Sequence, residues 1–340
     1  VAAADGCQLP RLPHSIVART HLFGFLATQT HAVDPMLSHW LQHYAGLGLD
    51  IRRRATIVLH VNSNQSKGLT ETLQLLNAHR VPQPIIATQW SSNIKRDAVN
   101  ALMSRLPSNA YLVYADSDEF FDYPCMLEGE LKRKRPGLAI RGEMFDRVAA
   151  DWSLPAIKPT TSMDKQFPRR CRITKCGDPG DPENDSKWTL LPVVDASDKP
   201  VRFQSASSLI GKPKLFYLRW PFSHFKLTSA TYERTRVKIH EYQHLADAAG
   251  PNTTQALRNQ SQNRVDHYVR FFTQLFEQAG SAGKYRSNDW LALTASSCLN
   301  FTFAIVNSTI NATHHTPHTR HVLHATHNTP HTTRHTSYTT

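Results

Sequence analysis

The sequence AYLVYADSDEFF, residues 110–121, decides the fold. An unbroken apolar and aromatic run of this kind is typical of a strand buried on both faces, as the strands of parallel sheets are. Asp116, Asp118 and Glu119 follow the run directly. Because open α/β sheets bind their ligands beyond the carboxyl ends of the strands, these acids stand where a binding site is expected.

The residues before this strand alternate between strand and helix patterns. We expect strands within 15–28, 55–61 and 84–88 and helices in the stretches that separate them. In the first helix Asp34 supplies an N-cap, Pro35 the first turn and Gly48 the end. The alternation predicts an α/β fold with a mostly parallel central sheet and helices on its faces.

The pattern is looser after residue 150. Residues 176–200 are rich in Asp, Pro, Gly and Lys and are interpreted as a surface loop, and 214–220 as a late strand followed by PFSHFK. Apolar residues at helical spacing in 265–276 predict a closing amphipathic helix. We expect one folded domain over 1–282 and a low-complexity tail over 283–340, which ends in disordered His/Thr repeats.

The chain of 340 residues carries a formal net charge of +12, which favours an anionic partner such as nucleic acid, an acidic membrane surface or a phosphorylated small molecule. Nucleic acid is disfavoured because no aromatic-interleaved binding module accompanies the basic clusters. Five cysteines are present, of which Cys171 and Cys176 either pair or stay free. Asn-x-Ser/Thr sequons, such as that at Asn64, make secretion plausible.

Asp116 and Asp118 carry the predicted chemistry. In an extended chain both side chains project to the same side, where two ionised carboxylates repel each other unless a cation lies between them. Mn²⁺ or Mg²⁺ prefers oxygen ligands and often combines carboxylates with substrate phosphates. The pattern predicts a metal–diphosphate site, in which the cation acts as a Lewis acid. The alternative is that this Asp-x-Asp is an ordinary turn or helix cap.

Two residues of PFSHFK extend this prediction. His224 can complete the metal shell, and Lys226 can contact phosphate. The alternative for His224 is an ordinary half-buried histidine, because the chain contains 19.

Five blocks of the sequence resemble, in order, those of the family-2-like and family-92-like glycosyltransferases. They are LSHWLQHYAGLGLD (37–50), DSDEFFDYP (116–124), GEMFDRVAADWSL (142–154), QFPRRCRIT (166–174) and SHFKLTSATYERTRVKIHEY (223–242). The resemblance implies a fold of the GT-A type, in which residues 1–282 form the catalytic domain. It also implies transfer of a sugar from a nucleotide-sugar donor to a glycan, protein or lipid acceptor, with Mn²⁺ or Mg²⁺ as the cofactor.

The resemblance also implies roles for single residues. Asp116 and Asp118 would bind metal and donor diphosphate, with His224 as a further metal ligand. Lys95 and Asp97 lie where such enzymes contact the nucleotide. Asp146 is the candidate general base if the enzyme inverts the anomeric centre, and a structural ion pair near Arg147 is the alternative. The family's habits, together with the sequons, favour the secretory pathway and the Golgi membrane, with a possible membrane anchor upstream of Val1.

Three other functions compete with this prediction. A haloacid-dehalogenase-like phosphohydrolase also uses Asp-x-Asp after a buried strand, but that family has Thr or Val where this chain has Phe120. A non-catalytic basic protein would hold nucleic acid or anionic glycan through its charge alone. A degenerate transferase would keep the fold without the activity.

Overall fold

The computed structural model describes residues 11–28, 33–61, 67–87, 92–123, 127–133, 137–151, 154–171, 186–205, 208–215, 220–225 and 228. The predicted helix at 265–276, the tail and the proposed boundary at residue 282 lie outside these residues. None of the helices within them has the length and apolar character needed to cross a bilayer.

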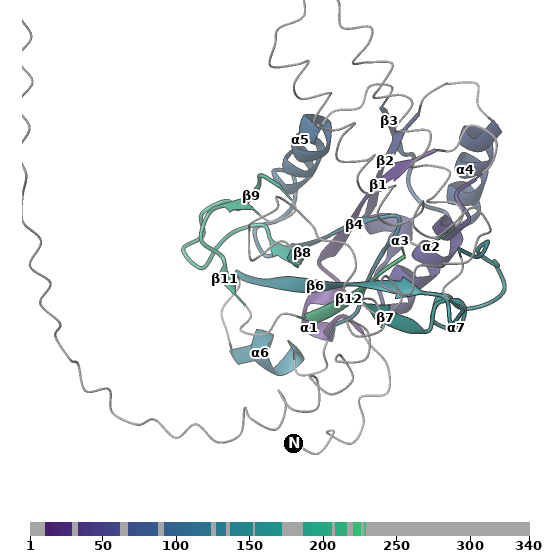
Figure 1. Cartoon of the computed structure of the whole chain (residues 1–340). Coiled ribbons are helices and arrows are strands. Elements are labelled where there is room, and N and C mark those ends of the chain that lie inside the picture. Colours follow the sequence, from purple (N-terminus) through teal and green to yellow (C-terminus); the bar gives the residue numbers. More distant parts are fainter. Residues whose placement is uncertain are drawn as a thin grey trace, which may run out of the picture.

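The first half of the described chain alternates as predicted (Figure 1). Its elements are α1 (His14–Val17), β1 (Thr20–Ala27), α2 (Met36–Gly46), α3 (Ile51–Arg54), β2 (Ala55–His60), α4 (Lys67–Ala78), β3 (Ile85–Ala87), α5 (Ser92–Met103), β4 (Tyr111–Asp116) and β5 (Glu119–Phe121). The first strand is shorter than predicted because α1 occupies the start of 15–28. Asp34 accepts a hydrogen bond from the backbone N–H of Met36 at 3.0 Å, which confirms its part in starting α2.

The second half of the described chain adds mainly strands. These elements are α6 (Leu127–Arg133), β6 (Leu138–Val148), α7 (Met163–Gln166), β7 (Arg169–Cys171), β8 (Ser186–Pro192), β9 (Arg202–Phe203), β10 (Leu209–Ile210), β11 (Lys214–Leu215) and β12 (Trp220–His224). Cys171 is disulfide-bonded, to a cysteine outside the described residues.

One large sheet organises the described residues, with the strand order β3-β2-β1-β4-β8-β6-β12-β5. β3, β2, β1 and β4 are mutually parallel, and β12 is parallel to β6. β8 runs antiparallel to both β4 and β6 and so joins the two groups of strands. The α/β prediction with a mostly parallel, helix-flanked sheet is therefore confirmed.

Two predictions for this half of the chain were wrong. Residues 186–192, expected within a surface loop, form the fully buried strand β8. Polar residues before and after them dominated the composition of 176–200, whereas Trp188, Leu190 and Leu191 form a local apolar run that packs in the sheet. The position of His224 also differs: the strand predicted at 214–220 is present at its start as β11, but β12 begins at Trp220, so His224 lies within a strand and not after one.

The core lies on both faces of the sheet. One hydrophobic cluster joins β1 and β2 to α2 and α4 through residues such as Trp40 and Leu76. A second cluster joins the opposite face of β1 and β4 to α5 through Val99 and Met103. Gly24 of β1 is needed for the first cluster, because a Cβ there would lie 2.8 Å from the ring of Trp40.

Candidate functional site: a lysine-braced acidic turn facing a histidine

The order of the strands creates a topological switch point where the predicted site lies. From β1 the chain adds β2 and then β3 on one side, and it returns through α5 to place β4 on the other side of β1. The helices that cover the two faces therefore diverge between β1 and β4. A place where the strand order changes direction in this way is a topological switch point, and open α/β sheets bind ligands there. Asp116 ends β4 opposite Phe25 of β1, so it lies at this switch point.

The acids lie on a tight turn. β4 ends at Asp116, Ser117 and Asp118 form the turn, and β5 begins at Glu119. The backbone N–H of Asp116 donates a hydrogen bond to Oε2 of Glu119 at 2.9 Å. The expected extended chain over Asp116 and Asp118 was therefore wrong, because residues 117 and 118 form a turn. The two carboxylates still lie close enough for the charge of Asp118 to raise the pKa of Asp116.

Two lysines compensate the charge of Asp116. Lys95 Nζ lies 2.6 Å from its Oδ1 atom, and Lys187 Nζ lies 3.1 Å from its Oδ2 atom. Lys187 also lies 2.5 Å from Oε2 of Glu119. Burial raises the pKa of Asp116, but Lys187 and Lys95 lower it by more, so Asp116 is held ionised.

Lys187 is the residue that the sequence interpretation missed. Its side chain is only 2% exposed, and its ammonium group lies 4.4 Å from the centre of the Tyr114 ring. Burial lowers the pKa of Lys187, whereas Asp116 and Glu119 raise it well above its ordinary value. The buried ammonium group of Lys187 therefore contacts the carboxylates at both ends of the acidic turn, Asp116 and Glu119. The only local signal for this was the apolar run after Lys187.

A histidine faces the turn from β12. The parallel register of β12 and β6 places His224 beside Asp146, and Nδ1 of His224 lies 2.8 Å from Oδ1 of Asp146. The Nε2 atom of His224 lies 3.7 Å from Oδ2 of Asp118. Burial lowers the pKa of His224, but the two carboxylates raise it by more, to about 9.

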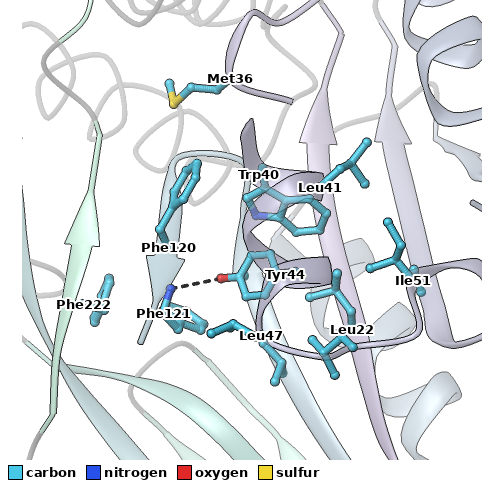
Figure 2. Packing of buried hydrophobic residues seen from close by; sticks show 14 of the residues in the cluster. Leu22, Met36, Trp40, Leu41, Tyr44, Leu47, Ile51, Phe120, Phe121 and Phe222 are labelled. Atoms are coloured by element: carbon cyan, nitrogen blue, oxygen red, sulfur yellow. Dashed lines mark hydrogen bonds between the residues drawn. The ribbon is translucent and has the colours of Figure 1, made fainter. Parts of the chain in front are cut away.

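Backbone contacts hold the turn in front of His224. The N–H of Phe225 donates to the carbonyl oxygen of Asp118 at 2.8 Å. From α2, the hydroxyl of Tyr44 donates to the carbonyl of Glu119 at 3.0 Å and accepts the N–H of Phe121 at 3.3 Å. Figure 2 shows the second of these bonds within the surrounding aromatic packing. β5 is an outer strand of the sheet, so α2 supplies the partners that another strand would otherwise supply.

A divalent cation fits part of this arrangement. Asp118 and His224 supply one oxygen and one nitrogen 3.7 Å apart, which two bonds of about 2.1 Å can span. Asp146 lies behind His224 in the way that carboxylates orient metal-binding histidines. Asp116 does not fit as a third ligand, since both of its oxygens face lysines. Within the described ranges no group of three His, Cys, Asp or Glu side chains forms a ready cage.

Of the three other predicted donor-binding residues, one lies at the site, one lies away from it and one lies outside the described residues. Lys95 joins the site through Asp116. Asp97 does not, because its side chain is 64% exposed and pairs with Arg96 at 2.9 Å. Lys226 lies outside the described residues.

Asp146 is placed differently from the position expected for a general base. It is fully buried, and its Oδ1 atom contacts His224. Arg147 does not bridge to it in a structural ion pair. Instead, Arg147 pairs with Asp164, at 2.5 Å.

No protein-family model matches the chain, and no curated protein sequence is significantly similar to it. Among solved structures, the chain is similar to S. aureus TarS 1-349, with 8% identity, coverage of 76% of this chain and 75% of that one, and a TM-score of 0.29. It is similar to the mannosyltransferase PcManGT from Pyrobaculum calidifontis in complex with GDP-Man and Mn²⁺, with 12% identity, coverage of 88% and 84%, and a TM-score of 0.34. It is also similar to a putative glucose-1-phosphate thymidylyltransferase from Bacillus anthracis, with 11% identity, coverage of 51% and 71%, and a TM-score of 0.28. A functional assignment therefore rests on the chain's own residues.

Proposed function

We propose that this chain is a metal-dependent glycosyltransferase that moves a sugar from a nucleotide-sugar donor to a glycan, protein or lipid acceptor. The observation that carries the proposal is that His224, which is oriented by Asp146, lies next to Asp118 just after the carboxyl end of β4. Asp116, two residues before Asp118, ends β4 at the switch point between β1 and β4, where open α/β sheets bind nucleotides.

In this proposal Asp118 and His224 hold Mn²⁺ or Mg²⁺, and donor phosphate oxygens complete the shell. When bound, the cation supplies positive charge that stabilises the departing nucleoside diphosphate. Asp146 orients the His224 ring and keeps Nε2 directed towards Asp118. Because Asp146 is fully buried behind the histidine, we assign it this positioning role in place of acceptor deprotonation.

Asp116 has a different role from Asp118. Its charge is compensated by Lys95 and Lys187, so it forms a stable polar edge of the switch point without a metal cation. Lys95 is 20% exposed at the same edge and is the described cation best placed to approach a donor phosphate. The acidic turn is thus formed before metal and donor arrive, which lowers the entropic cost of binding them.

The experiment is a screen of UDP- and GDP-sugars against the purified chain with Mn²⁺, Mg²⁺ or chelator. Thermal stabilisation is measured first, because a ligand that binds only the folded state raises its apparent stability. Release of nucleoside diphosphate is measured second, with p-nitrophenyl phosphate as a phosphohydrolase control substrate. We expect one nucleotide-sugar to stabilise and react only with metal, and Asp118→Asn to abolish both effects. Phosphatase activity without any response to nucleotide-sugars would contradict the proposal.

A further inference from the structure

A small lobe that packs on α5 through Asn100 combines exposed apolar and basic side chains. We call residues 195–203 and 208–215 the basic lobe; it contains the two-stranded sheet of β9 and β10, and β11, which pairs with β6 of the large sheet. Of the four large hydrophobic residues reported as exposed in the described chain, Ile210 at 57% and Leu215 at 56% belong to it. The exposed basic residues of the lobe are Lys199, Arg202, Lys212 and Lys214.

Backbone contacts link the two segments of the basic lobe. β9 and β10 pair so that Arg202 lies opposite Ile210. Gly211, at φ +116°, turns the chain from β10 towards β11. The carboxylate of Asp195 accepts backbone N–H groups of Ser197, Lys199 and Lys212, which ties the two segments together.

The charge of the lobe is net positive. Its four basic residues stand against two acids, Asp195 and Asp198, which gives a net charge of +2. Surfaces that insert into the interface of anionic bilayers combine apolar side chains with neighbouring cationic side chains. Exposed Ile and Leu side chains do not favour nucleic-acid binding, because the bases stack on aromatic rings or arginine.

A pocket next to the lobe adds apolar surface. It has a volume of about 540 Å³ and is lined by Met103 and Leu106 near the end of α5, by Val193 and Val201, and by Arg202. The site residue Lys95 is on the first turns of α5, roughly 14 Å along the helix from Ser104 of the pocket. The pocket therefore lies towards the end of α5 opposite to Lys95, whereas Phe203 of β9 packs on Tyr114, with 4.8 Å between the ring centres.

We propose that the basic lobe docks the protein peripherally on an anionic phospholipid bilayer. Ile210 and Leu215 insert between the headgroups, and Lys199, Arg202, Lys212 and Lys214 contact lipid phosphates. This inference is independent of the proposed sugar transfer, since it uses none of the residues of the acidic turn.

The test is co-sedimentation of the full chain with phosphatidylcholine vesicles, with and without phosphatidylserine, in chelator. We expect binding only with phosphatidylserine, and weakening as salt is raised, because the charges become screened. Ile210→Ser with Leu215→Ser should weaken binding by about tenfold or more. Lys212→Glu with Lys214→Glu should weaken it by at least about fivefold for each residue.

The chain offers a matched control. Ile85 and Ile86 of β3 are 53% and 43% exposed but lie outside the lobe, at the β3 edge of the sheet. Ile85→Ser with Ile86→Ser should bind like the wild type, and circular dichroism should show every variant folded. Failure of the wild type to bind phosphatidylserine vesicles, or an equal loss in the control, would overturn the proposal. Loss on charge reversal without loss on the Ile210 and Leu215 changes would also overturn it, since that points to a soluble polyanion.

Discussion

The ammonium group of Lys187 lies 2.5 Å from a carboxylate oxygen of Glu119, although 68 residues separate the two in the chain. Both side chains are buried, and Lys187 also contacts Asp116. This contact makes the acidic turn part of the folded core. The turn is therefore expected to depend on Lys187 even without a cation or donor.

Replacement of Lys187 by Met should destabilise the fold strongly. The change leaves Glu119 buried without its cation, and breaking a buried pair typically costs about 3–5 kcal/mol. The free energy of unfolding, measured by urea titration, checks this. Lys187→Met with Glu119→Leu should recover much of the loss, because it removes both charges. Additive losses in the double variant would show that the pair has no coupling.

His224 should make the stability of the metal-free protein dependent on pH. Its folded pKa of about 9 exceeds the ordinary 6.5, so its contribution is complete below pH 6.5 and is lost as the pH rises through 9. The shift corresponds to roughly 3 kcal/mol. Urea titrations in chelator from pH 6 to pH 10 measure it. His224→Gln should lack this dependence, and parallel curves for both proteins would contradict the assignment.

Loss of the Tyr44 hydroxyl group alone should lower the free energy of unfolding. Tyr44→Phe leaves the packing in place but removes the partner of the Glu119 carbonyl and of the Phe121 N–H. Unsatisfied buried groups of this kind cost about 1–3 kcal/mol. Urea denaturation should show that loss. A wild-type free energy of unfolding in Tyr44→Phe would mean that β5 does not depend on α2.

Gly142 should tolerate no side chain. A Cβ there would overlap the Thr189 methyl group and lie 2.7 Å from the ring of Phe222, so Gly142→Ala should cost about 1–3 kcal/mol. Gly46→Ala is the control, because nothing lies within 4 Å of a Cβ in that helical position and Ala is the better helix former. Thermal melts should rank Gly142→Ala below the wild type and Gly46→Ala at or above it.

Local patterns in the sequence predicted much of the fold. Asp34, Pro35 and the spaced apolar residues after them specify α2 through contacts a few residues apart. The buried run 110–115 similarly predicted β4. The position of the acids at the end of β4 followed from the α/β pattern alone.

The contacts that define the site could not be predicted in this way. His224 and Asp146 are 78 residues apart, and only the register of β12 on β6 brings them together. Lys187 was missed because a buried lysine is rare and the surrounding composition resembles a loop. Asp116 and Asp118 were expected on an extended chain because nothing local distinguishes an extended Asp-x-Asp from a turn.

The most direct test of the central claim is Mn²⁺ titration of the purified chain followed by electron paramagnetic resonance of free Mn²⁺, with a nucleoside diphosphate present. The account predicts one site that is lost in Asp118→Asn and His224→Gln, weakened about 10–100-fold in Asp146→Asn, and unchanged in Asp97→Asn. Equal Mn²⁺ affinity in all four variants and the wild type would contradict it.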